Sequence, residues 1–221
     1  MENIINYVNH KLSVLKPDGG KHKTSDVRKL ASRVYMSIKN KSFESKLDIC
    51  ESLLEQKTWA MSVIAYDMAF RERKNYTYDT FDRFEKWLIN YVRGWGYCDD
   101  FCTHAFGALL AEYNDLFDKI FAWCDRPEFW MRRAAAVILI YPINKGMSTQ
   151  LHPFMISDAL MCDENDLVLK GYGWMLKVYG SKYPVQLEKY LCENVKKMPR
   201  ISFRYALEKL DEETRRKLMQ K

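Results

Sequence analysis

A position that recurs at a nearly fixed interval divides the middle of the chain into units of similar length. The same place in four successive segments is taken by Trp59, Trp95, Trp130 and Val168, at separations of 36, 35 and 38 residues. A small, apolar segment follows in two of them, as Ala-Met-Ser-Val-Ile-Ala after Trp59 and as Ala-Ala-Ala-Val-Ile-Leu after Arg133. One such unit cannot bury its apolar face alone. A period in the upper thirties therefore predicts that neighbouring units stack on one continuous core.

Helices are expected over almost the whole chain. Apolar residues recur at three-to-four-residue spacing, and we find no segment with the alternation of a strand. This pattern predicts helices at 2–15, 25–39, 43–55, 58–71, 79–92, 96–113, 115–124, 127–141, 149–161, 165–180, 184–194, 199–208 and 211–220. Two helices per unit at this period are typical of HEAT-like repeats. We therefore expect an all-α fold, a right-handed α-solenoid of HEAT-like helical-pair repeats that forms a single domain over residues 1–221.

Composition indicates an intracellular globular protein. The 221 residues are 48% hydrophobic and 29% charged, which is ample for a continuous core. The six cysteines lie mostly in apolar helical patterns, without a Cys-x-x-Cys pair or zinc-site spacing, as reduced core cysteines do. There is no signal peptide and no apolar run of about 18 residues or more. We expect a protein of the cytoplasm (the bacterial cytoplasm or nucleoid) that does not span a membrane.

The formal charge of +6 permits an anionic partner without requiring one. The basic run of Lys196, Lys197, Arg200 and Arg204 is by itself typical of a solvated face. His104 and His152 have no second ligand or nucleophile at a meaningful spacing, and no glycine-rich phosphate loop is present. We therefore expect no metal and no small-molecule cofactor. We also expect a monomer, because residues 211–221 are polar enough to cap the end of a repeat array.

Three helical segments combine tryptophan with charge, each predicted near the start of a helix that is otherwise buried. They read Trp95-Gly-Tyr-Cys-Asp99, Trp130-Met-Arg132-Arg133-Ala-Ala-Ala and Lys170-Gly-Tyr-Gly-Trp174. Asp99 lies one helical turn from Trp95, so the two share a face. Taken singly, the tryptophans are more often core residues and an arginine pair is more often a solvated one. Stacked together, two indoles, a carboxylate and a guanidinium suit a cationic sugar and its phosphates better than a plain core.

This ordered set, Trp95, Asp99, Arg133 and Trp174, resembles the AlkD-type HEAT-like-repeat DNA glycosylases. The resemblance covers roughly residues 25–210 and is strongest from 87 to 180. It implies excision of cationic N3- or N7-alkylated purines from duplex DNA by hydrolysis of the N-glycosidic bond, without a base-binding pocket and without a cofactor. The partner it implies is double-stranded DNA that contains alkylated bases.

The resemblance also implies a role for each matched residue. Asp99 would stabilise the oxocarbenium-like sugar and orient the attacking water, with the faces of Trp95 and Trp174 against the sugar. Arg133 would hold a neighbouring phosphate. Arg132 and Lys170 would be further phosphate contacts.

Two alternative functions remain open. Enzymes of this family usually carry a further aromatic-rich helical segment that closes over the DNA, whereas this chain begins with the 2–15 helix and a loop at 17–20. Tyr7 or Tyr35 is a candidate for the closing aromatic residue. The short N-terminus favours a non-catalytic relative that binds distorted or branched DNA, whereas the intact Asp99 favours catalysis. A HEAT-type protein-interaction scaffold is the other alternative, and it predicts a groove without a concentrated positive stripe.

Overall fold

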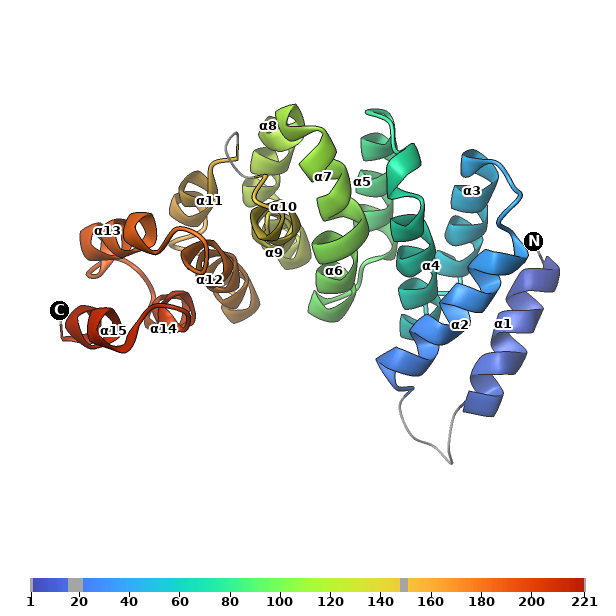
Figure 1. Ribbon diagram of the computed structural model, residues 1–221, viewed down its shortest axis with the longest axis horizontal. Helices are drawn as coiled ribbons and strands as arrows, with labels where there is room; N and C mark the ends of the chain where they lie inside the picture. The colour runs from blue at the N-terminus through green and yellow to red at the C-terminus, as the bar shows by residue number, and fades with distance from the viewer. Residues whose placement is uncertain (1, 16–21, 148–150, 221) are drawn as a thin grey trace. The chain divides into compact units, whose positions relative to one another are not determined.

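The computed structural model describes residues 2–15, 22–147 and 151–220. The chain divides into two compact units, Met1–Leu109 and Leu110–Lys221. Both consist of helices, and the part of the chain that is described contains no strand (Figure 1). The all-α class expected from the sequence is therefore confirmed. The single domain over 1–221 stays a prediction, and the loop expected at 17–20 lies outside the described residues.

The first unit is built around one almost wholly buried helix. Its helices are α1 (Glu2–Leu15), α2 (Thr24–Ser37), α3 (Phe43–Leu54), α4 (Trp59–Arg71), α5 (Thr80–Tyr91), α6 (Trp95–Phe101) and the first residues of α7 (Gly107–Glu112), with a 3₁₀ turn at Arg73–Asn75. Every residue of α4 from Ala60 to Ala69 is buried, because α2, α3 and α6 all pack against it. A helix that is apolar on all sides belongs inside such a cluster.

The second unit is organised around α12 in the same way. Its helices are α8 (Phe117–Phe121), α9 (Phe129–Val137), α10 (Ile140–Asn144), α11 (Pro153–Ala159), α12 (Asp166–Gly180), α13 (Pro184–Asn194), α14 (Arg200–Leu207) and α15 (Glu212–Met219), with 3₁₀ turns at Asn114–Leu116 and Ala122–Asp125. α12 packs against α9, α10, α11, α13 and α14. Across the described ranges of both units, each helix is too short or too polar to cross a membrane.

The recurring position found in the sequence marks the starts of the central helices. Trp59 and Trp95 are the first residues of α4 and α6, which pack together in the first unit. Trp130 and Val168 lie in the first turns of α9 and α12, which pack together in the second. The period of 35 to 38 residues therefore corresponds to one helical pair plus its connections, as predicted.

The helix expected over 127–141 is broken in two. α9 ends at Val137, and α10 begins at Ile140 after a turn. Pro142 explains the break. It has no N–H to donate to the carbonyl of Ile138, and its ring would clash with that carbonyl in a continuous α-helix.

The helix expected over 96–113 is continuous, but its middle is wider than an α-helix. Residues Cys102–Phe106 form a π-helical turn between α6 and α7. The hydroxyl of Thr103 donates a hydrogen bond of 2.7 Å to the carbonyl of Asp99, and His104 Nδ1 lies 3.0 Å from the carbonyl of Asp100. These side chains compete for carbonyls that a regular helix uses in its own ladder, which favours the wider turn. π turns of this kind are rare and occur often at functional sites.

Four of the six cysteines are buried, as their apolar surroundings predicted. Cys50, Cys98, Cys102 and Cys124 lie in the core, whereas Cys162 is exposed and Cys192 is half-buried. All six are free thiols.

Candidate functional site

α6 places Trp95 and Asp99 on one wall of a cleft within the first unit. Trp95 begins the helix directly after Gly94, and this residue is 54% exposed. Asp99 follows one turn later and is half-buried. The cleft has a volume of about 380 Å³ and is lined by Thr24, Trp59, Val63, Trp95, Gly96, Asp99, Asp100, Thr103 and His104. The structure therefore brings this predicted pair together, as helical spacing requires.

Trp59 is a second indole in the same cleft, and the sequence interpretation did not include it among the site residues. It begins α4, where the Thr58 hydroxyl accepts a hydrogen bond of 3.4 Å from the backbone N–H of Met61 and caps the helix. The 36-residue separation from Trp95 was the available signal, because equivalent positions of stacked units lie side by side. The cleft thus combines two aromatic side chains with carboxylates, a combination that attracts cations.

Asp100 also lines the cleft and is held by an arginine from α2. Arg28 forms an ion pair with Asp100 and contacts the Asp67 carboxylate of α4 at 3.3 Å. Asp67 also pairs with Arg71, at 2.6 Å. Burial raises the pKa of Asp100, although the charges of Arg28 and His104 oppose the rise. Sequence reasoning missed this cluster, because Arg28 and Asp100 are 72 residues apart.

Arg133 is buried, which differs from the surface position that phosphate binding suggests. Only 5% of it is exposed, and its guanidinium donates a hydrogen bond to the carbonyl of Leu167. A Cβ at Gly171 would lie 3.1 Å from the Arg133 side chain, so the glycine lets the arginine pack closely against α12. Arg133 therefore joins α9 to the helix that carries Lys170 and Trp174.

The other candidates of the second unit lie on α9 and α12 in different environments. Arg132 is 2.6 Å from the Asp163 carboxylate and donates to the carbonyls of Arg126 and Pro127. Lys170 is half-buried, 3.9 Å from the Asp166 carboxylate. Trp174 is half-buried and lies midway along α12, so the expected position near a helix start is wrong for this tryptophan.

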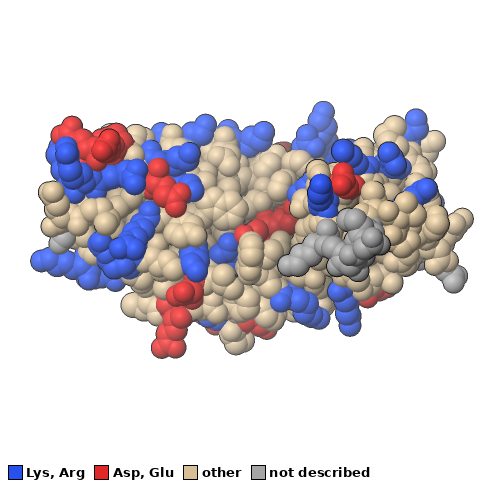
Figure 2. All heavy atoms as spheres, turned by 90° about the horizontal axis from the view of Figure 1, so that it is seen from below, with Lys and Arg blue, Asp and Glu red and all other residues tan. Residues whose placement is uncertain are grey.

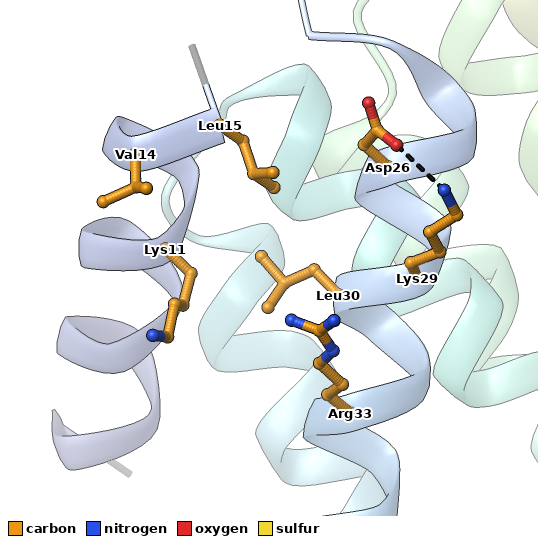
Figure 3. Close-up of a pocket in the computed structure, with 7 residues that line it drawn as sticks. All are labelled: Lys11, Val14, Leu15, Asp26, Lys29, Leu30 and Arg33. Carbon is orange, nitrogen blue, oxygen red and sulfur yellow. Dashed lines mark hydrogen bonds and ion pairs between the residues drawn. The ribbon is translucent and has the colours of Figure 1, made fainter.

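A second hollow, of about 360 Å³, lies between α1 and α2. Figure 3 shows Lys11 on α1, Leu30 and Arg33 on α2, and Asp26 paired to Lys29 at 3.3 Å. Within the described residues neither Lys11 nor Arg33 has a carboxylate partner. These two cations are therefore free to meet an anion.

Positive charge is distributed over the molecule. Lys and Arg number 17 against 14 Asp and Glu in residues 1–109, and 18 against 15 in residues 110–221. Figure 2 shows the Lys and Arg side chains spread across the face that it presents, with smaller acidic groups between them. Each unit by itself therefore carries a small basic excess.

Two comparisons with known proteins, one with family models and one with solved structures, find similarity. A family model described as DNA alkylation repair enzyme matches residues 22–210. A solved structure described as a predicted DNA alkylation repair enzyme from Enterococcus faecalis is similar in fold, with a TM-score of 0.72 and 17% sequence identity over 86% of this chain and 87% of that chain. No curated protein matches the chain. The likeness to the solved structure, together with the paired helices, confirms the α-solenoid class expected from the repeat.

Proposed function

Because the chain belongs to the DNA alkylation repair enzyme family, we propose that it is a DNA glycosylase that removes cationic N3- and N7-alkylated purines from duplex DNA. The family's name gives DNA repair as the role and DNA as the partner. The observation that carries the finer proposal is the cleft of the first unit, where Asp99 lies beside Trp59 and Trp95. It joins a carboxylate to aromatic faces, which suits a sugar that becomes positively charged.

The proposed reaction is hydrolysis of the N-glycosidic bond. An alkylated purine already carries a positive charge, so the bonding electron pair can leave with the base without a general acid. Positive charge then develops on the deoxyribose, as in other oxocarbenium-like glycoside cleavages. The Asp99 carboxylate stabilises that charge and orients the water whose oxygen bonds to C1′. The water's proton is released to solvent or to the carboxylate.

The tryptophans would stabilise the positive charge on the sugar by cation–π contacts with their indole faces. A cation over an indole face gains roughly 0.5–2 kcal/mol, more as water is excluded. Trp95 has an exposed ring for such a contact, and Trp59 adds a second in the first unit. The sugar contact assigned to Trp174 stays a prediction. Because the reacting group is the sugar, this mechanism needs no pocket that reads the base edge, unlike glycosylases that flip a nucleotide into one.

Phosphate contacts would supply the affinity. Of the three residues assigned to this task, Lys170 is the one we favour, because its ion pair with Asp166 is long, at 3.9 Å. The contacts assigned to Arg132 and Arg133 stay predictions, and each would compete with the hydrogen bonds that those side chains already make. Lys11 and Arg33 are additional candidates in the first unit.

The first experiment compares wild type with Asp99→Asn for release of 7-methylguanine and 3-methyladenine from methylated duplex DNA. We expect release to fall on the order of a hundredfold or more, because a preorganised charge aimed at developing charge is lost. Binding to duplex DNA, followed by fluorescence anisotropy, should persist. Asp118→Asn is the matched control, because Asp118 is an exposed aspartate on α8, outside the residues that line the cleft.

Each result that contradicts the proposal would lead to a different conclusion about function. Full release by the Asp99→Asn variant would remove Asp99 from the mechanism. Absence of release by wild type, with salt-sensitive DNA binding, would support the non-catalytic DNA-binding relative. Absence of both release and binding would support the protein-interaction scaffold.

A further inference from the structure

His104 lines the cleft of the first unit together with Asp99, although the two are five residues apart in the chain. In a regular α-helix five residues turn through about 500°, so position 104 would project about 140° away from position 99. The π turn at Cys102–Phe106 changes this relation, because its hydrogen bonds join residues five apart, which then lie little more than one turn from each other. The wider turn therefore brings a histidine toward the face that carries Asp99.

Two contacts decide which ring nitrogen of His104 carries the proton. Nδ1 lies 3.0 Å from the carbonyl oxygen of Asp100 and 3.2 Å from the hydroxyl oxygen of Thr103. The Thr103 hydroxyl donates its only proton to the carbonyl of Asp99, at 2.7 Å, so it offers Nδ1 a lone pair and no proton. Both neighbours of Nδ1 are therefore acceptors. In the neutral imidazole the proton is on Nδ1, and Nε2 keeps its lone pair.

This lone pair is accessible and its direction is set by packing. The His104 side chain is 40% exposed, and Nε2 has no hydrogen-bond partner among the described residues. Nδ1 is turned toward the backbone of its own helix, so Nε2 lies at the opposite edge of the ring. The ring also packs at 83° to the ring of Phe70 from α4, with the centroids 5.8 Å apart. An oriented lone pair in a cleft that also holds a carboxylate meets the requirements of a general base.

We propose that His104 is a catalytic residue of the cleft, whose Nε2 accepts a proton from the water that attacks C1′ of the deoxyribose. The proposal rests on the proposed function, because it assigns a role in the same reaction. Asp99 orients the water, and His104 gives the water's proton an acceptor inside the cleft, ahead of solvent or the carboxylate.

The step balances in atoms and charge. The bond between C1′ and the purine nitrogen breaks, and its electron pair leaves with the base, which becomes neutral. The water oxygen forms the new bond to C1′, one of its O–H bonds breaks, and that proton goes to Nε2. The imidazolium that results has Nδ1 at 3.8 Å from Oδ1 of Asp100, whose opposite charge stabilises it. Solvent takes up the proton after the base has left.

The test is single-turnover release of 7-methylguanine from methylated duplex DNA by wild type and His104→Asn, corrected for spontaneous loss. The asparagine amide can still donate to the carbonyl of Asp100, so this helix contact is kept while the base is lost. We expect release to fall about ten- to a hundredfold. This is at or below the lower end of general-base effects, because water is only weakly bonded in an oxocarbenium-like transition state.

His152→Asn is the matched control and should release base at the wild-type rate. The His152 ring also packs at a steep angle on a phenylalanine, with its centroid 5.5 Å from that of Phe117. It lies on the second unit and outside the residues that line the cleft.

Chemical rescue separates a catalytic role from a structural one. In His104→Ala, added imidazole should restore part of the lost release, whereas it should have no effect on wild type. Undiminished release by His104→Asn would overturn the proposal and leave the glycosylase function standing. A loss of release in His104→Ala that imidazole leaves unchanged would also overturn it. Circular dichroism confirms that each variant is folded.

A second readout does not depend on activity. Nitrogen NMR of the wild-type histidines at alkaline pH, where imidazoles are neutral, should show the proton of His104 on Nδ1. A proton on Nε2 would overturn the inference even in an active enzyme, because that nitrogen could not accept another. Absence of release by wild type would instead overturn the proposed function, and the role of His104 with it.

Discussion

In the first unit, a buried carboxylate is stabilised by hydrogen bonds and an ion pair from a few single residues. Glu72, which follows α4, is 2% exposed and accepts hydrogen bonds from Tyr35 at 2.5 Å, Lys46 at 2.7 Å and Asn75 at 2.7 Å. Burial alone would raise the pKa of Glu72, but these hydrogen bonds and the Lys46 charge lower it. The hydrogen bond to Glu72, followed by burial, raises the pKa of Tyr35 to about 12. The cluster is a satisfied buried ion pair that ties α2, α3 and α4 together.

Glu72→Gln should destabilise the protein by about 3 kcal/mol at pH 7, because it leaves the Lys46 ammonium buried without its counter-charge. Since the folded-state pKa of Glu72 is lowered, its contribution is fully present above the ordinary value of 4.5 and is lost as the pH falls through the lowered value. The difference in unfolding free energy between wild type and variant should therefore shrink below about pH 4. Urea unfolding at pH 7 and at pH 3.5 measures it. Glu164→Gln, at an exposed position, serves as control, and a constant difference at both pH values would contradict the prediction.

For single residues, the sequence predicts contacts within one helix but not contacts between separate helices. Trp95 and Asp99 could be paired because four residues along a helix return to the same face. Arg28 and Asp100, or Glu72 and Lys46, could not, because their contact depends on how separate helices pack. Arg133 shows the same limit. The family resemblance implied a phosphate contact for Arg133, but Gly171 on the neighbouring helix provides space for the side chain to be buried.

The positions of most helices were predicted closely from the sequence. The spacing of apolar residues and the residues typical of helix ends are local properties, which the sequence shows directly. α1 agrees with its predicted range at both ends, and α12 and α13 agree within about one residue. The helix expected over 115–124 is α-helical only at Phe117–Phe121, between two 3₁₀ turns, and the helix expected over 149–161 begins at Pro153. Two interruptions inside helices were also not predicted, namely the break before Pro142 and the π turn at Cys102–Phe106. In both, the period of the sequence favours an uninterrupted helix, and a single backbone or side-chain interaction overrides it.

The crossing of α12 and α14 gives a prediction at the same scale. A Cβ at Gly173 would lie 2.8 Å from the Cβ of Tyr205 and 2.9 Å from the carbonyl oxygen of Ser202, which is backbone and cannot rotate away. Gly173→Ala should therefore destabilise the protein by about 1–3 kcal/mol, although alanine is the better helix former.

The control for this variant is Gly96→Ala. Its added methyl would meet no atom within 4 Å, so it should be neutral or stabilising by up to about 1 kcal/mol. Thermal unfolding of both variants measures the contrast. Equal melting temperatures would show that the two helices are not held as closely as described.

At the scale of the whole molecule, the basic excess is shared by the two units, so neither alone accounts for the net charge of +6. Binding to DNA should then depend on cations of both. The sequence predicted the size of the excess, but it could not say which cations are already paired. Arg83, for example, is bound by Glu44, Asp48 and Glu51. Arg33 and Arg204 are exposed and have no carboxylate partner in the described ranges.

Arg33→Ala and Arg204→Ala should each weaken binding to undamaged duplex DNA and reduce the slope of log K against log salt by about 0.9, as expected for loss of one phosphate contact. Lys86→Ala, which removes an exposed cation from α5, should leave the slope unchanged. Affinities measured by anisotropy at several salt concentrations give the slopes. A change for Arg204 alone would restrict DNA binding to the second unit, and equal changes for all three would indicate a nonspecific effect of net charge.

The π turn beneath the cleft has a consequence for the comparison of this chain with its relatives. A helix advances about 100° per residue, so the wider turn at Cys102–Phe106 offsets the direction of every side chain before it relative to those after it. Consider a relative whose helix is α-helical throughout, aligned to this chain without a gap on the residues after the π turn. The residues then matched to Trp95 and Asp99 would have side chains that point about 100° away from those of Trp95 and Asp99. A one-residue gap between 101 and 107 restores the correspondence. Two residues of related chains are therefore equivalent at this site only if their side chains project from the helix in the same direction, in addition to being of the same type.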